Sequence, residues 1–295
     1  AEEREGAVAA TAPVRPGAHV RRKGEDIRAG ETVLRAGTIL GPAEVAWLAS
    51  SSRLCARVHR RPRVAILSTG DELVPPGEPL GPGQIHDCNG LAVAAAVRQL
   101  GGEAAVLGIA RDERASLHAL LEEGLRADVL VTTAGVSMGD RDFVRDVLDA
   151  LEVKQVFWKI DIKPGRPTAF AVRGSTCVFS LPGNPVSTLI TFEEFVRPAL
   201  LRMMGHRHVL RPTVRATFQD EIARKPGRVS FLRVRLERRG AELLAWSAGN
   251  QDTGIVSTML RADGIAVVPA ESGDLRPGAA VDVQILRAGF GGSRA

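Results

Sequence analysis

The stretch Leu130-Val131-Thr132-Thr133-Ala134-Gly135-Val136-Ser137-Met138-Gly139-Asp140-Arg141-Asp142 decides the fold of this chain. It begins as an apolar strand, breaks into small residues and glycine, and resumes as a helix behind acidic residues. Such a turn presents backbone N–H groups at the carboxyl end of a strand, a geometry that binds anions. Ligands of parallel α/β sheets bind beyond these strand ends, so the turn predicts one wall of a binding site.

We expect three further segments to supply the other walls of this site. They are Ser68-Thr69-Gly70-Asp71-Glu72-Leu73, Lys159-Ile160-Asp161-Ile162-Lys163-Pro164-Gly165-Arg166-Pro167, and Leu181-Pro182-Gly183-Asn184-Pro185-Val186-Ser187. Each one follows or contains an apolar run and then turns on glycine, proline or acidic residues, which is typical of loops at strand ends.

The composition predicts a soluble, cytoplasmic protein of two or more domains. The chain has 295 residues, of which 44% are hydrophobic, so it can bury a full core. No apolar run approaches the roughly 18 residues that a membrane span needs, and the polar amino end does not resemble a signal peptide. Cys55, Cys88 and Cys177 have no paired spacing, which argues against a disulfide framework and a zinc site.

The charge balance favours a small anionic ligand. Lys and Arg exceed Asp and Glu by 39 to 34, giving a net charge of +5. Aromatic residues make up only 4% of the chain and Tyr is absent, which argues against nucleic acid as the partner. The sequence has no Walker loop, no Gly-x-Ser-x-Gly elbow and no metal-binding histidine spacing, so motor chemistry and nucleophilic hydrolysis are disfavoured.

The order of the expected elements predicts an α/β fold. Between residues 63 and 205, apolar strands such as 64–68, 103–109 and 128–133 alternate with helices, as in parallel βαβ units. Asp87 and Asn89 offer capping oxygens ahead of a helix over residues 91–100. The Pro-Gly-Asn-Pro turn is expected to lead into one long helix that Gly205 ends. We expect a three-layer α/β/α core with a mostly parallel sheet there. Residues 206–295 carry short alternating segments between Gly and Pro turns, which predict a small β-barrel-like domain. Residues 1–62 close no core of their own and are expected to form a partial N-terminal domain.

Four acidic residues are candidates for chemistry. Asp71 and Glu72 follow a buried strand directly, either as simple turn formers or as carboxylate ligands for Mg²⁺. Asp112 is expected to cap a helix, and Asp142 lies in a first helical turn where the helix dipole favours negative charge. Asp112 and Asp142 can also reach into the predicted crevice.

The cations and prolines of the other two segments point to an anion pocket. Lys159 and Lys163 alternate with apolar residues and are expected to project to one face of an extended segment. With Arg166 they would form a clamp for phosphate or an oxyanion, although a solvated edge strand explains the same pattern. Pro182 and Pro185 make a rigid turn that caps a helix, shapes a pocket, or does both.

In this order and spacing, the four motifs resemble the MoeA-type molybdopterin molybdenumtransferase family, which is related to the E domain of gephyrin. The resemblance runs from about Arg15 to the carboxyl end. It implies insertion of molybdenum from molybdate into adenylylated molybdopterin, with release of AMP and assistance from Mg²⁺. It also implies a homodimer and allows other molybdenum cofactor biosynthesis proteins as partners.

The resemblance implies roles for individual residues. It places Glu72, Asp112, Asp142, Lys159 and Lys163 in catalysis, with Glu72 and Asp142 on the metal. The residues expected to bind substrate are Thr69, Gly70, Asp71, Thr133, Gly135, Val136, Ser137, Gly139, Pro164, Gly165, Arg166, Pro182, Gly183, Asn184, Pro185 and Thr253.

The chain departs from the family pattern at several positions. Ala134 and Asp252 stand where glycine is usual, and Arg166 stands where lysine is usual. An upstream Asp-Gly-Tyr-Ala motif that completes the neighbouring subunit's site is absent, which suggests either a fragment or a naturally shortened protein. Two other functions remain open: a molybdopterin adenylyltransferase with the same core fold, and a non-catalytic scaffold that binds molybdopterin.

Overall fold

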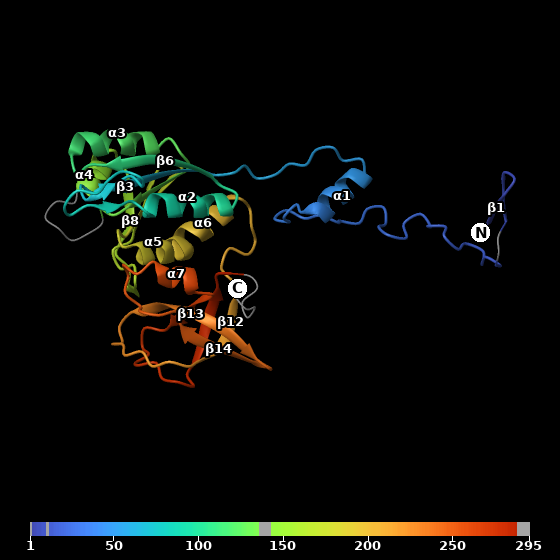
Figure 1. Cartoon of the computed structure of the whole chain (residues 1–295). Helices are drawn as coiled ribbons and strands as arrows, with labels where there is room; N and C mark the ends of the chain where they lie inside the picture. The colour runs from blue at the N-terminus through green and yellow to red at the C-terminus, as the bar shows by residue number, and fades with distance from the viewer. Residues whose placement is uncertain (1, 10–11, 136–142, 288–295) are drawn as a thin grey trace. The chain divides into compact units, whose positions relative to one another are not determined.

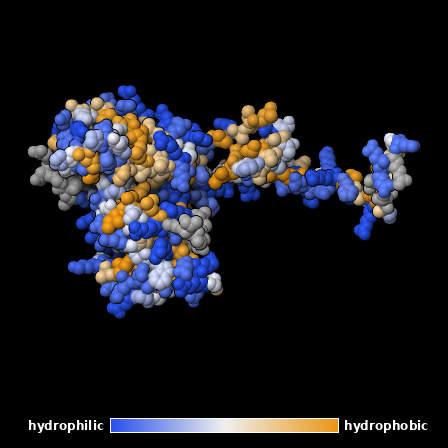
Figure 2. Space-filling view, viewed as in Figure 1, coloured by the Kyte–Doolittle hydropathy of each residue, from blue (hydrophilic) through white to orange (hydrophobic). Residues whose placement is uncertain are grey.

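The computed structural model describes residues 2–9, 12–135 and 143–287, and it divides into two compact units, Ala1–Ala56 and Arg57–Ala295. The first unit contains the strand pair β1 (Glu2–Arg4) and β2 (Ala7–Ala9) and the helix α1 (Pro42–Ser50). None of its described residues is buried. Apolar side chains such as Ile39 and Val45 are exposed around α1, where Figure 2 shows a gathering of hydrophobic residues.

The second unit begins with a mixed six-stranded sheet whose strand order is β6-β3-β7-β11-β10-β8. β6, β3, β7 and β11 are parallel, and β10 is antiparallel to both of its neighbours. The strands are β3 (Arg63–Thr69), β6 (Glu103–Ala110), β7 (Val129–Thr133), β8 (Lys154–Trp158), β10 (Ala169–Arg173) and β11 (Thr176–Leu181); β4 (Leu73–Val74) and β5 (Ile85–His86) form a short parallel pair beside them. The predicted α/β class with a mostly parallel sheet is confirmed.

Helices cover both faces of this sheet (Figure 1). On one face, Ala65 and Leu67 of β3 belong to a buried cluster with α3 (Arg114–Gly124) and α4 (Phe143–Ala150). On the other face, Val64 and Ile66 belong to a cluster with α2 (Asn89–Gln99) and with the helices that follow β11. Because side chains alternate along a strand, the four consecutive apolar residues are buried against opposite layers. The three-layer core predicted for this region is confirmed.

The helix expected after the Pro-Gly-Asn-Pro turn is divided into three parts. α5 (Pro185–Thr191) passes into a π-helical turn, η1 (Phe192–Val196), and then into α6 (Arg197–Met203). A π turn shifts the side chains that follow it around the helix, and it places Glu193 and Glu194 beside the C-terminal domain. None of the described helices combines the length and apolar character that crossing a membrane would require.

The C-terminal part is a closed five-stranded barrel, which confirms the predicted β-barrel-like domain. Its elements are β12 (Thr213–Phe218), β13 (Val229–Arg239), β14 (Glu242–Ser247), the short helix α7 (Ser257–Arg261), β15 (Gly264–Val268) and β16 (Ala280–Ile285). The barrel closes because β14 pairs with both β12 and β13. A two-residue strand from the α/β half, β9 (Ile162–Lys163), pairs in parallel with β13.

The prediction that Lys159 and Lys163 share one face of an extended segment is wrong. Lys159 follows β8 with a φ of 69°, in the left-handed region, so the chain turns there instead of continuing as a strand. β8 belongs to the α/β sheet, whereas Lys163 ends β9 in the barrel sheet. The alternation of side chains holds only within one strand, and here the chain passes from one sheet to another.

A carboxylate at the amino end of β7 gives a first prediction. Asp128 accepts two hydrogen bonds from the Arg60 guanidinium and one from the Arg63 backbone N–H. The Arg60 side-chain hydrogen bond is the main reason that the pKa of Asp128 is lowered to about 2. A lowered pKa stabilises the fold above the unfolded value of about 4, and this contribution is lost as the pH falls toward 2. We expect Asp128→Asn to lower the free energy of unfolding by about 1 kcal/mol at pH 7, since the exposed Arg60 is well solvated.

Urea unfolding at pH 7 and pH 3 measures this contribution. The gap between Asp128→Asn and the unsubstituted chain should narrow at pH 3, because Asp128 is protonated in the unfolded chain there while it stays mostly ionised in the folded chain. A gap that stays constant or widens as the pH falls would contradict the assignment.

Candidate functional site

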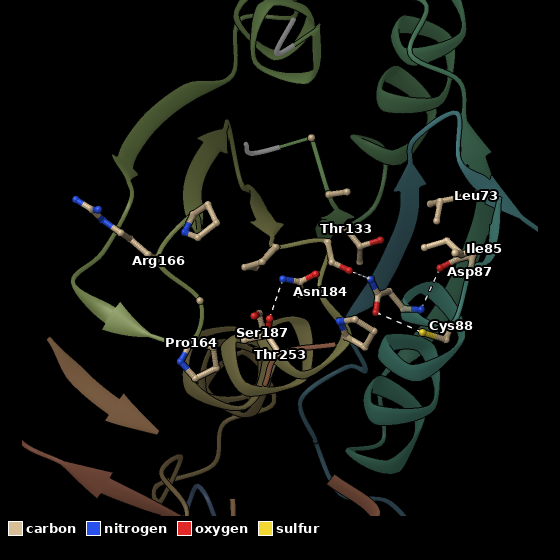
Figure 3. Close-up of a pocket in the computed structure, with 18 of the residues that line it drawn as sticks. Leu73, Ile85, Asp87, Cys88, Thr133, Pro164, Arg166, Asn184, Ser187 and Thr253 are labelled. Atoms are coloured by element: carbon tan, nitrogen blue, oxygen red, sulfur yellow. Dashed lines mark hydrogen bonds between the residues drawn. The ribbon is translucent and has the colours of Figure 1, made fainter. Parts of the chain in front are cut away.

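A cavity of about 500 Å³ lies beyond the carboxyl ends of β3, β7 and β11, where the α/β sheet faces the barrel (Figure 3). The four segments predicted to form walls all contribute to it, together with residues from the start of α2 and from the barrel. Its lining consists of Glu72, Leu73, Ile85, His86, Asp87, Cys88, Asn89, Thr133, Ala134, Gly135, Ile162, Lys163, Pro164, Gly165, Arg166, Pro167, Pro182, Gly183, Asn184, Pro185, Ser187, Arg228 and Thr253.

The described part of the central turn lies at the end of β7. Thr133 is buried, and its carbonyl accepts a hydrogen bond of 3.3 Å from the Thr69 hydroxyl, which is itself buried behind the cavity lining. Ala134 donates its N–H to the carbonyl of Leu181 at 3.0 Å, which joins the turn to the end of β11. Four predicted site residues of this turn lie outside the described residues: Val136, Ser137, Gly139 and Asp142.

Acidic side chains gather after β3. Glu72 lines the cavity, and its carboxylate folds back over Gly70, where a Cβ would lie 2.5 Å from a Glu72 oxygen. Gly70 has a φ of 140°, so both its conformation and this close approach require glycine. Asp71 accepts the backbone N–H of Asp112 at 3.1 Å. Asp71 and Asp112 therefore lie directly beside the Glu72 wall without lining the cavity themselves.

Asp112 does not cap the following helix, so that prediction is wrong. The N-cap of α3 is Glu113, and no side chain caps this helix. Partial burial raises the pKa of Asp112, and the negative charges of Asp71 and Glu72 raise it further. Asp112 therefore forms an acidic group with Asp71 and Glu72, and its carboxylate does not cap α3.

The acidic group supplies oxygen ligands of the kind that Mg²⁺ prefers. Within residues 2–9, 12–135 and 143–287, no set of three or more His, Cys, Asp or Glu side chains is arranged to hold a metal ion. Mg²⁺ commonly takes only one or two protein carboxylates and completes its shell with water and substrate phosphates. Glu72 on the cavity wall fits that mode of binding, since its carboxylate is exposed to the cavity.

Three cations line the cavity, and all of them belong to one of two copies of the same short motif. Lys163 and Arg166 belong to Lys163-Pro164-Gly165-Arg166, and Arg228 ends the second occurrence of this motif, Lys225-Pro226-Gly227-Arg228. The two segments are adjacent because β9 pairs with the beginning of β13. Figure 3 shows Arg166 on the side of the cavity opposite Asp87 and Ile85. Lys159 lies outside the lining.

The Pro-Gly-Asn-Pro turn connects the α/β sheet to the barrel. The Asn184 side chain donates a hydrogen bond of 2.8 Å to the Thr253 hydroxyl, and the Val186 N–H donates to the Thr253 carbonyl at 3.1 Å. Asp252, which replaces a usual glycine, turns its carboxylate back to accept the Gly254 N–H at 2.8 Å. The barrel loop therefore presents Thr253 to the cavity and keeps the Asp252 carboxylate out of its lining.

Several cavity residues were not identified from the sequence. Asp87 and Asn89 were interpreted only as capping residues, and Cys88 and Arg228 were not proposed for the site. Ser187 was included in a wall segment but was not proposed as an individual binding residue. Ser187 ends a motif already singled out, and the repeated Lys-Pro-Gly-Arg sequence was a signal for Arg228. Asp87 does accept the backbone N–H groups of Asn89 and Gly90 at the start of α2, at 3.0 and 3.1 Å, so its predicted capping is confirmed.

Ala134 gives a second prediction. Its φ of 68° is in the left-handed region, which is unfavourable for alanine by about 1 kcal/mol relative to glycine. Its Cβ also lies 3.2 Å from the position that a Cβ at Gly183 would take. We expect Ala134→Gly to raise the free energy of unfolding by up to about 1 kcal/mol and Gly183→Ala to lower it. The loss from Gly183→Ala should shrink in the Ala134→Gly background, because the crowding methyl is then absent.

Thermal unfolding of the single and double variants measures this coupling. Glu152→Gly is the matched control, since Glu152 also has a left-handed φ of 58° but lies outside the cavity lining. A stabilising control together with a destabilising Ala134→Gly would rule out backbone strain as the dominant effect at Ala134.

Comparison with known proteins identifies the three parts of the chain. Residues 1–52 match the MoeA N-terminal region (domain I and II), residues 65–202 match a probable molybdopterin binding domain, and residues 215–286 match the MoeA C-terminal region (domain IV). The cavity is formed by the second and third of these regions.

Individual relatives give the same answer. The chain is 34% identical to a molybdopterin molybdenumtransferase from Haemophilus influenzae, covering 92% of this chain and 67% of that protein. It is 36% identical to molybdopterin molybdenumtransferase 1 from Mycobacterium tuberculosis, covering 92% of this chain and 65% of that one. A MoeA crystal structure from Pyrococcus horikosii has a TM-score of 0.80 and 35% identity, over 94% of this chain and 68% of that one. The chain spans about two-thirds of the length of these relatives, and it belongs to the MoeA-type molybdopterin molybdenumtransferase family.

Proposed function

We propose that this protein inserts molybdenum from molybdate into adenylylated molybdopterin and releases AMP. The observation that carries the proposal is the cavity between the α/β sheet and the barrel, where Lys163, Arg166 and Arg228 lie together with the carboxylate of Glu72. Molybdate and the phosphate groups of the adenylylated substrate are anions, and a cavity that combines cations with a carboxylate of the kind that Mg²⁺ prefers suits both.

The residues of this chain would act mainly by binding and positioning anions. Lys163 and Arg228 would hold a tetrahedral oxyanion or phosphate, with Arg166 supplying a further cation at the cavity edge. The Pro182–Pro185 turn and the end of β7 would fix the organic part of the substrate through backbone groups and small side chains. Thr253 would contact the bound substrate from the barrel side, in the orientation that its hydrogen bond with Asn184 sets.

Glu72 and Asp142 are proposed to hold Mg²⁺, as the family resemblance implies. When bound, the ion would neutralise the charge of a phosphoryl group during cleavage of the adenylyl bond. Asp71 and Asp112 would make the electrostatic potential at Glu72 more negative, because their carboxylates lie beside the Glu72 side chain. This potential would favour a bound cation there. On the same resemblance, Lys159 is proposed to act in catalysis.

The adenylyltransferase alternative is disfavoured by the barrel. Arg228 and Thr253 reach the cavity from the region that matches MoeA domain IV, and a single α/β domain would supply neither. A non-catalytic scaffold would keep the cavity but would not turn the substrate over, so only an activity measurement separates it from the enzyme. A homodimer and contacts with other molybdenum cofactor biosynthesis proteins are further proposals from the resemblance, and a cytoplasmic location is a proposal from the composition.

The decisive experiment follows AMP release and molybdenum incorporation together. The chain is incubated with adenylylated molybdopterin, molybdate and Mg²⁺, and both products are quantified over time. Stoichiometric AMP release and incorporation would support the transferase. Tight binding of the substrate without either product would support the scaffold, and adenylylation of molybdopterin from ATP would support the adenylyltransferase. Molybdate is then replaced by tungstate to compare the two oxyanions.

A further inference from the structure

A largely buried hydrogen-bond network forms part of the cavity wall, and its centre is Asp87. This residue is 7% exposed, and it forms no ion pair with any residue in the described part of the chain. Its Oδ2 accepts the Ser68 hydroxyl at 2.6 Å, and its Oδ1 accepts the two N–H groups at the start of α2. Both carboxylate oxygens are thus engaged in fixing the end of β3 against the first turn of α2.

The same network reaches the central turn. The Thr133 hydroxyl donates to the Ser68 hydroxyl at 3.1 Å, so the ends of β3 and β7 share one buried polar cluster with Asp87. Thr133, Ser68 and Asp87 are all buried, and an unpaired polar group there would be unfavourable. The cluster therefore holds its members in a single arrangement.

Asn89 extends the network to the turn that follows β11. Its side-chain amide, on the first turn of α2, donates a hydrogen bond of 2.6 Å to the carbonyl of Gly183. The next residue, Asn184, is the one that donates to Thr253 of the barrel. Figure 3 shows the hydrogen bond between Asn184 and Thr253. A continuous path of hydrogen bonds and one peptide unit thus connects the α/β sheet with the barrel loop.

We infer that Asp87 and Asn89 are positioning residues that hold the Pro182–Asn184 turn, and through it Thr253, in the arrangement that binds substrate. Asp87 fixes the first turn of α2, and Asn89 on that turn fixes the Gly183 carbonyl. Neither residue is needed as an acid, base or metal ligand in this role. The effect on turnover rests on the proposed function, whereas the effect on the turn does not.

Three substitutions test the inference in the full chain. Asn89→Asp keeps the shape of the side chain but removes the donor and sets a carboxylate against the Gly183 carbonyl. Asn89→Ala removes the side chain altogether. Asp87→Asn keeps an acceptor for the α2 N–H groups and a polar partner for Ser68, so it should be much milder. Asp128→Asn is the matched control, because Asp128 lies at the other end of β7 and lines no part of the cavity.

Two measurements are made on each variant. Amide hydrogen exchange over residues 183–188 reports whether the turn is still held, and steady-state kinetics reports kcat and KM for adenylylated molybdopterin. We expect faster exchange and a 10- to 100-fold lower kcat/KM in both Asn89 variants, since small displacements of a binding wall have effects of that size. Asp87→Asn should stay within a few-fold of the unsubstituted chain, and Asp128→Asn should leave exchange in this turn and kcat/KM unchanged.

The outcomes separate this inference from the proposed function. Unchanged exchange in both Asn89 variants would overturn the inference, and so would faster exchange with unaltered kcat/KM. Loss of activity in Asp87→Asn equal to that of the Asn89 variants would also overturn it, because a positioning role tolerates the amide. A chain without any turnover would refute the proposed function instead, and the exchange data would still decide whether Asn89 holds the turn.

Discussion

Replacing Lys163 with methionine is expected to lower kcat/KM for molybdenum insertion by about 100-fold, because preorganised charge in an active site contributes on that scale. Lys163 ends β9 and lines the cavity, with Arg166 and Arg228 as its cationic neighbours there. Methionine keeps a long apolar side chain, so the strand and its pairing with β13 should persist. Steady-state kinetics with molybdate as the varied substrate measures the effect. We expect it largely as a higher KM for molybdate.

The chain contains a close control for this substitution. Lys225 begins the second Lys-Pro-Gly-Arg segment, as Lys163 begins the first, and it is exposed but does not line the cavity. Lys225→Met makes the same change in net charge and in side-chain chemistry without removing a cation from the lining. The two variants differ only in where the charge is lost, so their kcat/KM values are compared directly. Values within a few-fold of each other would contradict a specific role for Lys163 in the cavity lining.

The sequence was sufficient to predict the sheet because its signal is local and strong. Val64 to Leu67 are four successive apolar residues between polar ones, and only burial on both faces accommodates such a run. Since parallel strands end at the same edge, the motifs that follow them were expected to meet, and Glu72, Asn184 and Gly135 do line one cavity. The roles of these residues in binding and catalysis stay predictions.

Features that depend on contacts between distant segments were not accessible from the sequence. Asp87 was recognised as a helix-capping residue, but its bond to Ser68 requires knowing that α2 begins against the end of β3. Arg228 reaches the cavity only because β9 leaves the α/β half and pairs with β13. The left-handed turn at Lys159 redirects the chain between two sheets, which is why the simple alternation of Lys159 and Lys163 failed. Periodicity describes one element at a time, and these contacts join several.

Replacing Glu193 with alanine is expected to produce the largest loss of stability. Glu193 lies in the π-helical turn and accepts two hydrogen bonds from the Arg211 guanidinium, at 2.8 and 2.9 Å. Its carboxylate also lies 3.6 Å from Arg197, one turn further along the helix. All three side chains are largely buried, with exposed fractions of 15%, 21% and 12%. Arg211 in addition donates to the Leu286 carbonyl at the end of the barrel, so the cluster joins helix and barrel.

Removal of the Glu193 carboxylate leaves two guanidinium groups close together with little solvent. Burial lowers the pKa of Arg197, and repulsion from the neighbouring positive charge of Arg211 lowers it further. Breaking a buried ion pair from one side is strongly unfavourable, and with some solvent access we expect a loss of about 2–3 kcal/mol in the free energy of unfolding. Urea unfolding measures the loss, and Glu237→Ala is the control, because the ion pair of Glu237 with Arg239 is exposed and should contribute little to stability.

Val186, Ile190 and Phe231 belong to one buried apolar cluster, which also joins the helix to the barrel. If they dominate, Glu193→Ala will be no more destabilised than Glu237→Ala, and the ion cluster will not be what fixes the barrel beside the cavity.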